Sequence, residues 1–317
     1  MSPDFAADHN TWGVVPGPLA PKGGVAPPYA DVKEAVAQVL AAVQRNLPAT
    51  FAPPPIEEVV AAIRQHRPEV VIHMATITHF SARAEERLRI NLHGTRLVFD
   101  YCHEFGVKQV VFVGRHTIYG AAPDAPLYRT EDEPPLAVST FPELADLVAA
   151  DLYAGSALWR WPELKTAVLR LVYLLGPARR GTLANLLDGK RVPMILGFDP
   201  LFQFMHEYDV VSAICLALEA KIRGVYNVAG DGALSIHQIA ARMGKRCRVL
   251  PAGLLRSGLW LLKKLGLTQY GPEQLDFLRY RPVLLNTRLK EEFGYTPKLS
   301  SAQVFELYRA SRQTPAP

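Results

Sequence analysis

From residue 56 onward, short apolar runs alternate with segments of helical periodicity. Strands that alternate with helices favour parallel pairing through right-handed crossovers. The sequence therefore predicts an α/β fold: a Rossmann-like doubly wound parallel sheet with a smaller, mainly helical C-terminal lobe. We expect helices at residues 56–66, 82–105, 143–159 and 208–220, and strands at residues 69–76, 109–114, 166–175 and 224–230.

The predicted strand at residues 109–114 ends in an abrupt polar turn, Arg115-His116-Thr117, followed by Ile-Tyr-Gly. A continuous apolar run is typical of a strand buried in a parallel sheet, and ligands bind at the carboxyl ends of such strands. At that place an imidazole could act as an acid or base near neutral pH, and a guanidinium could bind a phosphate or carboxylate. The turn is therefore the first candidate for a functional site.

The composition is that of a globular chain with a substantial core. Of the 317 residues, 49% are hydrophobic and 21% are charged, which argues against disorder throughout the chain. The net charge of +5 is scattered and no nucleic-acid motif accompanies it, so no nucleic-acid partner is expected. Cys102, Cys215 and Cys247 lie far apart without CxxC spacing, so neither a disulfide framework nor a zinc site is expected.

Two features bear on membranes and on the compartment. The N-terminus lacks the pattern of a signal peptide, and no apolar run is long enough to span a membrane, so a cytoplasmic protein is expected. Residues 253–269 form a basic amphipathic helix, which is compatible with docking on a membrane surface. The helical periodicity favours the alternative, in which the leucine stripe packs inward, so no membrane contact is expected.

The sequence divides into three parts. Residues 1–55 are rich in proline and contain one helical stretch at residues 31–44, which is a poor beginning for a compact sheet. We assign residues 56–178 and 201–220 to a Rossmann-like nucleotide-binding domain. Residues 179–200 and 221–317 are assigned to the substrate lobe.

Short motifs follow one another between residues 70 and 297. They read Val-Val-Ile-His-Met-Ala at 70–75, Asn-Leu-His-Gly-Thr at 91–95, Leu-Arg at 169–170 with Leu-Gly-Pro at 175–177, Phe-Met-His-Glu-Tyr-Asp-Val-Val at 204–211, Gly-Val-Tyr-Asn-Val-Ala-Gly at 224–230 and Phe-Gly-Tyr-Thr-Pro at 293–297. In this order they resemble the extended short-chain dehydrogenase/reductases of the NAD-dependent epimerase/dehydratase type. The resemblance covers about three quarters of the chain.

The resemblance implies a nicotinamide cofactor, NAD or NADP, and a small-molecule substrate such as a nucleotide sugar. It also allows a homodimer, and it implies no metal. The residues it places against the cofactor are Ala75, Thr76, Asn91, Tyr173 and Gly176, and those it places against the substrate are Arg170, Gln203 and His206.

The sequence departs from the family at two places that carry its chemistry. A glycine-rich phosphate turn between a first strand and a helix is absent, since Gly23-Gly24 stands among prolines. The Tyr-x-x-x-Lys pair, whose lysine lowers the pKa of the tyrosine, is replaced by Phe141 and Ala145. Arg115 stands where the catalytic Ser or Thr of the family falls.

Two interpretations concern the ligand site; a third is a membrane-surface assembly protein that uses the helix at residues 253–269. In the first, the protein transfers hydride with an atypical proton donor from the turn of Arg115, His116 and Thr117, helped by Asp151 and Tyr153 on the following helix. In the second, these are ordinary turn and helix residues, and the chain is a catalytically inactive relative that retains the fold as a binding or scaffold protein.

Overall fold

The computed structural model describes residues 56–74, 76, 83–176, 187, 191–268 and 271–313. Its main sheet has four parallel strands in the order β1-β2-β4-β9, which confirms the predicted parallel α/β fold. The strands are β1 (Val70–His73), β2 (Gln109–Arg115), β4 (Lys165–Leu171) and β9 (Gly224–Val228). Residues 1–55, with the predicted helix at 31–44, lie outside the described residues.

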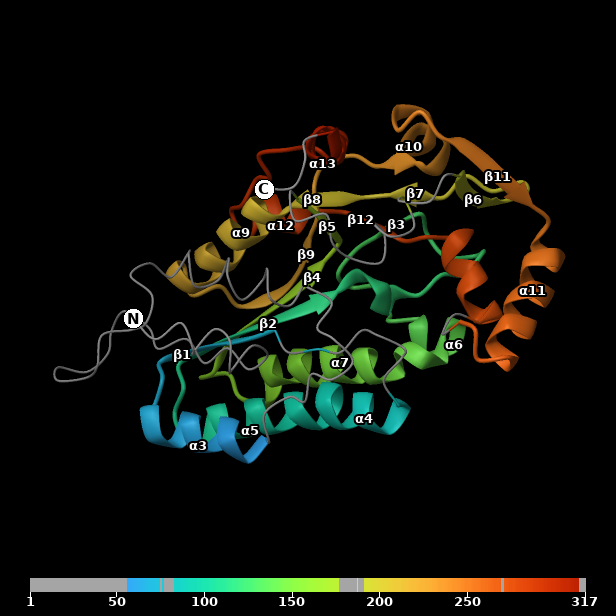
Figure 1. Ribbon diagram of the computed structural model, residues 1–317. Helices are drawn as coiled ribbons and strands as arrows, with labels where there is room; N and C mark the ends of the chain where they lie inside the picture. The colour runs from blue at the N-terminus through green and yellow to red at the C-terminus, as the bar shows by residue number, and fades with distance from the viewer. Residues whose placement is uncertain are drawn as a thin grey trace.

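Helices cover both faces of this sheet (Figure 1). One face carries α3 (Ile56–His66), α5 (Thr95–Glu104) and α7 (Ala145–Arg160), and the other carries α9 (Glu207–Glu219). Strand β2 is apolar at successive positions because both of its faces are buried. Val110 and Phe112 belong to one hydrophobic cluster, and Val111 and Val113 belong to a second one. A strand covered on both faces needs an apolar side chain at every position.

The predicted helix at residues 82–105 is one continuous helical segment with an internal change of pitch. It runs through α4 (Ala84–Leu88), the π-helical turn η1 (Arg89–Gly94) and α5. Shorter elements join the main ones. They are η2 (His116–Tyr119), β3 (Tyr128–Arg129), α6 (Ala137–Thr140), η3 (Pro142–Leu144), β5 (Tyr173–Leu175), β6 (Arg191–Ile195), β7 (Leu201–Phe202) and β8 (Phe204–His206).

The C-terminal part contains a third buried cluster, built around Phe202, Phe204, Phe305 and Tyr308. Its elements are β10 (Leu234–Ser235), α10 (Ile236–Arg242), β11 (Arg246–Leu250), α11 (Ala252–Lys264), η4 (Pro272–Leu278), β12 (Val283–Leu284), α12 (Thr287–Glu291) and α13 (Ser301–Gln313). Strands β6 and β11 pair in parallel beside it. Within the part of the chain that the structure describes, no helix combines the length and apolar composition needed to cross a membrane.

One domain boundary needs correction. The sequence assigns residues 221–317 to the substrate lobe, but β9 pairs with β4 along Ala167–Leu171 and is the fourth strand of the main sheet. The segment Gly-Val-Tyr-Asn-Val is a strand in either lobe, so only its pairing partner identifies the sheet to which it belongs. The rest of the predicted division stays a prediction.

Gly230, two residues beyond β9, allows a close backbone approach that we expect to be sensitive to substitution. A Cβ at this position would lie 2.3 Å from the carbonyl oxygen of Phe204. Gly230→Ala should therefore lower the free energy of unfolding by about 1–3 kcal/mol, as overpacking does. Gly155→Ala is the matched control in α7, where nothing lies within 4 Å; it should raise the free energy of unfolding by up to about 1 kcal/mol. Urea unfolding measures both, and equal effects of the two substitutions would contradict the expectation.

Candidate ligand site at the carboxyl end of the sheet

The polar turn after β2 is shaped by a glycine at its end. Arg115 is the last residue of β2, and His116 opens the 3₁₀ turn η2, which ends before Gly120. Gly120 has φ 69°, and a Cβ there would lie 2.7 Å from the backbone nitrogen of Ala137. Because only glycine meets both demands, the Tyr-Gly step fixes where the chain leaves the sheet.

Four side chains gather at this end of the sheet. The Nδ1 atom of His116 lies 2.9 Å from the carbonyl oxygen of Leu171, and the imidazole packs edge-on against Tyr173, 4.5 Å between ring centroids. Arg281 donates a hydrogen bond to the Tyr173 hydroxyl. Its guanidinium carbon also lies 5.0 Å from the centre of the Tyr173 ring and 4.2 Å from that of Phe202. Arg115 precedes His116 in the chain and interacts electrostatically with both His116 and Tyr173. We call Arg115, His116, Tyr173 and Arg281 the arginine-tyrosine cluster.

The arginine-tyrosine cluster carries two positive charges without a matching negative one. In the described parts of the chain, no carboxylate forms an ion pair with Arg115 or Arg281. Arg115 is half-buried, and burial lowers the pKa of its guanidinium while the nearby Tyr173 hydroxyl raises it. The Nε atom of Arg281 is buried and has no hydrogen-bond partner. Buried cations of this kind are paired in stable proteins, so the site has the charge and the free donor to take an anion.

His116 is neutral here at physiological pH. Burial lowers the pKa of its imidazole to about 3; the Leu171 carbonyl opposes this shift, while the charges of Arg281 and Arg115 add to it. Since the imidazole is neutral, the nitrogen that faces Leu171 carries the proton. The predicted role of His116 as a proton donor near neutral pH is therefore not supported.

Arg170 and Asp151 form a buried ion pair instead of facing a ligand. Arg170 Nη2 donates to Asp151 Oδ1 at 2.7 Å, and Nη1 donates to the Tyr119 hydroxyl at 2.8 Å and to the Glu131 carbonyl at 3.0 Å. Tyr119 in turn donates to Asn227 Oδ1 at 2.8 Å. Burial alone would lower the pKa of the Arg170 guanidinium, but the Asp151 carboxylate raises it. Every polar atom in the pair already has a partner within the protein, so these contacts lend no support to the catalytic role predicted for Asp151 or the substrate role predicted for Arg170, which stay predictions.

Tyr153 and Asn91 also lie away from the arginine-tyrosine cluster. The Tyr153 hydroxyl donates to Asp100 of α5 and accepts a hydrogen bond from Arg160, so it bridges two helices at the surface. Asn91 is buried in η1 and donates to Asp146 of α7 at 2.7 Å. Helix packing therefore accounts for the observed contacts of both residues.

The other predicted contacts are distributed as follows. Gln203 is buried and uses its amide on backbone atoms, donating to Gly230 and Leu284 and accepting from the Leu284 N–H. His206 caps α9, since its Nδ1 accepts a hydrogen bond from the Tyr208 N–H. Among the remaining predicted residues, Thr117 and Thr76 are half-buried. Gly176 lies so close to Glu207 that a Cβ at position 176 would be 2.3 Å from its carboxylate. Ala75 lies outside the described residues.

The positions that replace the catalytic pair of the family are apolar and filled. Phe141 is buried, and its ring packs edge-on against Phe277, 5.6 Å between centroids. Ala145 is the first residue of α7.

Arg281 is the site residue that sequence analysis missed, because nothing in the sequence around it places it against Tyr173, 108 positions earlier. Among the described residues, no group of three or more His, Cys, Asp or Glu side chains could hold a metal ion.

Because His116 is neutral when folded, it should make the protein less stable in acid. The pKa of His116 is about 3 in the folded protein and 6.5 in the unfolded chain. Below pH 6.5 the imidazole is therefore protonated in the unfolded chain but stays neutral in the folded protein. Buried His73, with a pKa of about 4, acts in the same direction. Each histidine should lower the free energy of unfolding by about 1.4 kcal/mol per pH unit as the pH falls towards 5.

His116→Asn keeps a donor for the Leu171 carbonyl and should remove its share of that slope. The measurement is the free energy of unfolding in urea between about pH 7 and pH 5. His93→Asn, at an exposed position, is the control and should keep the slope of the unchanged protein. A slope that His116→Asn leaves intact would show that His116 is already protonated in the folded state.

Comparison with known proteins agrees with this fold. The sequence profile of the NAD dependent epimerase/dehydratase family matches residues 54–229. An uncharacterized protein of Mycobacterium tuberculosis is 30% identical over 264 residues, which are 80% of this chain and 68% of that protein.

Solved structures share the architecture. UDP-glucose 4-epimerase of Thermotoga maritima with UDP-glucose superimposes with a TM-score of 0.62 and 21% identity, over 81% of both chains. The dTDP-glucose 4,6-dehydratase of Bacillus anthracis in complex with NAD gives a TM-score of 0.61 and 17% identity, over 83% of this chain and 79% of that one. The match to the family profile covers more than half of this chain, and the chain therefore belongs to the NAD dependent epimerase/dehydratase family.

Proposed function

We propose that this chain binds a nucleotide sugar, or a closely related phosphorylated small molecule, at the carboxyl end of β2. The observation that carries the proposal is the arginine-tyrosine cluster, in which Arg115 and Arg281 have no carboxylate partner in the described parts of the chain and Arg281 keeps a free buried donor. Guanidinium groups suit phosphates because they present several donors in one plane. Family membership supports the same ligand class, as does the UDP-glucose bound to the Thermotoga maritima epimerase.

We also propose NAD or NADP as a second ligand, on the strength of family membership and of the NAD bound to the Bacillus anthracis dehydratase. In the family, the cofactor accepts and returns a hydride. The described residues do not fit that chemistry in its usual form, since Arg115, Phe141 and Ala145 stand where the resemblance expects the catalytic Ser or Thr, Tyr and Lys. Burial lowers the pKa of the His116 imidazole, which disfavours it as an acid near neutral pH. Binding without the usual proton transfer is therefore our leading proposal.

One contact favours a second candidate function, an active oxidoreductase or epimerase with an atypical proton donor. The Tyr173 hydroxyl accepts a hydrogen bond from Arg281, so its own proton stays available for a ligand. In this alternative Tyr173, and not His116 or Thr117, moves the proton.

The binding proposal predicts that each arginine of the cluster contributes to affinity. Arg115→Ala and Arg281→Ala should each weaken the binding of UDP-glucose by about 10- to 100-fold, because a hydrogen bond to a charged group contributes about 1.5–3 kcal/mol. Isothermal titration calorimetry measures the Kd, with uridine as the ligand that lacks phosphate. Arg279→Ala is the matched control, since Arg279 pairs with Asp276 and stacks on Phe198, and it should leave the Kd unchanged. Equal binding by all four proteins, or none by the unchanged chain, would refute the proposal.

The two candidate functions differ in what Tyr173→Phe should do. If the chain only binds, neither the unchanged protein nor the variant should turn over UDP-glucose or oxidise NADH or NADPH. If Tyr173 donates the proton, the unchanged protein should be active, and Tyr173→Phe should lower kcat by about 100-fold or more with little change in ligand Kd. Nicotinamide fluorescence reports cofactor binding in the same samples, and a lack of response to both NADH and NADPH would remove the cofactor from either candidate.

A further inference from the structure

Helix α11 (Ala252–Lys264) packs no side chain into the core, and none of its residues is buried. This corrects the prediction that its leucine stripe packs inward. Leu254, Leu261 and Leu265 are 62%, 50% and 61% exposed. Their spacing of seven and four residues places them along one face of the helix, and Leu262 beside them is 41% exposed. The helix lies at the outer edge of the molecule (Figure 1).

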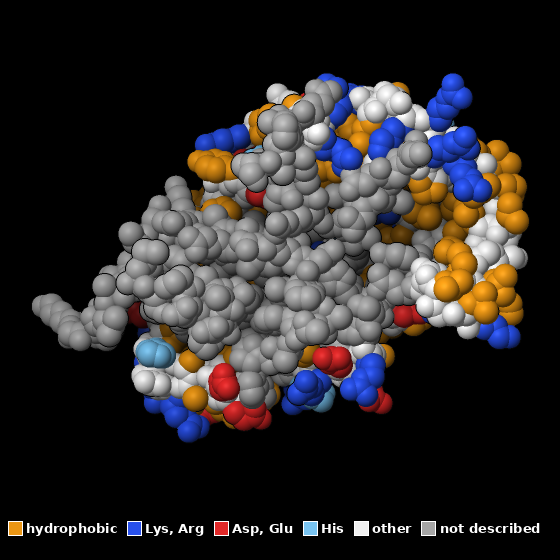
Figure 2. All heavy atoms as spheres, viewed as in Figure 1, with side chains coloured by type: hydrophobic (Ala, Val, Ile, Leu, Met, Phe, Trp, Pro, Cys, Tyr) orange, Lys and Arg blue, Asp and Glu red, His pale blue; other side chains and the backbone are white. Residues whose placement is uncertain are grey.

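The segment that carries this apolar face is basic in sequence, and one of its cations, Lys263, pairs with Glu143 of η3 at 3.4 Å. Residues 246–267 contain no Asp or Glu, and all five of their charged residues are exposed cations: Arg246, Arg248, Arg256, Lys263 and Lys264. Figure 2 shows hydrophobic side chains gathered over α11, with Lys and Arg side chains beside them over β6 and β11. We call this combination the α11 surface.

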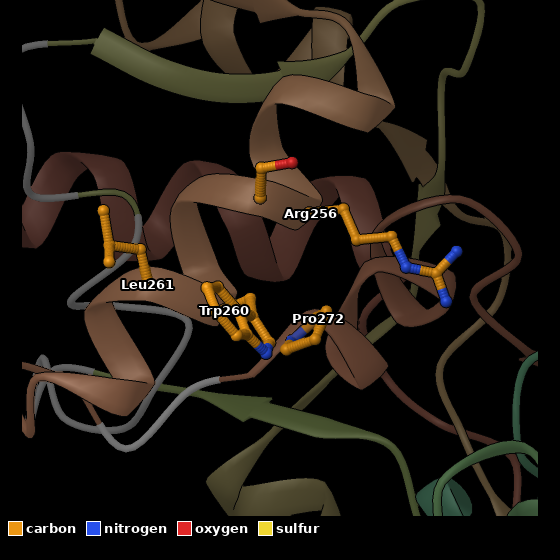
Figure 3. A pocket seen from close by; sticks show the side chains of 5 residues that line it. Arg256, Trp260, Leu261 and Pro272 are labelled. Atoms are coloured by element: carbon orange, nitrogen blue, oxygen red, sulfur yellow. The ribbon is translucent and has the colours of Figure 1, made fainter.

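Trp260 adds an amphipathic side chain to the α11 surface. Its indole is 55% exposed, and the Lys264 ammonium lies 5.1 Å from the ring centre. An open groove beside it is lined by Arg256, Ser257, Trp260, Leu261 and Pro272 (Figure 3). Tryptophan and basic side chains beside an exposed leucine face are the composition of helices that lie in the interface of a lipid bilayer.

We propose that the α11 surface docks this protein on an anionic phospholipid membrane, with α11 parallel to the membrane plane. Leu254, Leu261 and Leu265 enter the boundary between headgroups and acyl chains, and Arg246, Arg248, Arg256 and Lys264 supply positive charge for the lipid phosphates. A helix of 13 residues is about 20 Å long, too short to cross the hydrocarbon core of about 30 Å. The helix therefore lies on the membrane and does not span it.

The positive charge of the α11 surface favours an anionic membrane over a second copy of the chain as its binding partner. In a two-fold dimer the same patch lies on both sides of the interface. Lys263 pairs with Glu143 of its own chain, but Arg246, Arg248, Arg256 and Lys264 would meet the same four cations of the second copy. An anionic membrane offers the opposite charge. The proposal does not depend on the ligand site, whose residues belong to β2, β5 and the segment before β12.

The test is cosedimentation of the full chain with lipid vesicles. The protein should pellet with vesicles of phosphatidylcholine containing phosphatidylserine, much less with phosphatidylcholine alone, and less in both cases as salt is raised. The combined variant Leu254→Ser, Leu261→Ser and Leu265→Ser should bind at least about tenfold more weakly, and Arg256→Glu with Lys264→Glu should do the same. Leu127→Ser with Leu307→Ser removes leucines of similar exposure elsewhere (52% and 50%) and should bind as the unchanged protein does.

A second readout keeps the proposal falsifiable if a variant folds poorly. Trp260 fluorescence should shift to shorter wavelength when anionic vesicles are added, and Trp260→Phe should remove that shift while circular dichroism stays the same. Failure of the unchanged protein to pellet with anionic vesicles would overturn the proposal. The proposal would also be overturned if sedimentation equilibrium showed that the unchanged protein is a dimer and the leucine variant a monomer, because the leucine face would then contact a second copy of the chain.

Discussion

The buried guanidinium of Arg170 holds the carboxyl edge of the sheet together. Through Asp151, Tyr119 and the Glu131 carbonyl it joins β4 to α7, to η2 and to the loop after β3. A buried ion pair is tolerated only when its remaining donors and acceptors are satisfied, because the desolvation of two charges is otherwise too costly. Tyr119 completes the network by donating to Asn227 on β9, so β4, α7, η2, β9 and the loop after β3 are joined through one buried charge.

This network also constrains the residue next to the turn. A Cβ on Gly114 would lie 3.1 Å from Asp151 Oδ2, so a side chain at position 114 would crowd the ion pair. Arg115 follows Gly114 directly and belongs to the arginine-tyrosine cluster. The carboxyl end of β2 therefore borders two groups of side chains: the closed, structural network of Arg170, and the arginine-tyrosine cluster, which we propose binds an anion.

The sequence predicts the part of this arrangement that depends on local pattern. Apolar runs and helical periods are properties of neighbouring residues, so the parallel sheet, its helices and the place of the site at the end of β2 follow from them. The roles of individual residues do not follow from local pattern. Asp151 and Arg170 are partners only because α7 crosses β4 at that height, and Arg281 reaches Tyr173 from a segment far along the chain. The strand β9 is misassigned for the same reason, since its partner is β4 and not a neighbour in sequence.

The positive charge of this protein acts in two environments with different physics. At the arginine-tyrosine cluster the charges are partly removed from water, so salt screens them weakly and a small anion is held by directed hydrogen bonds. On the α11 surface the cations are hydrated and spread over one face, so each contributes little alone and only an extended anionic surface gathers all of them. Ionic strength should therefore separate the two kinds of binding: salt that releases the protein from a membrane should leave the ligand site largely occupied.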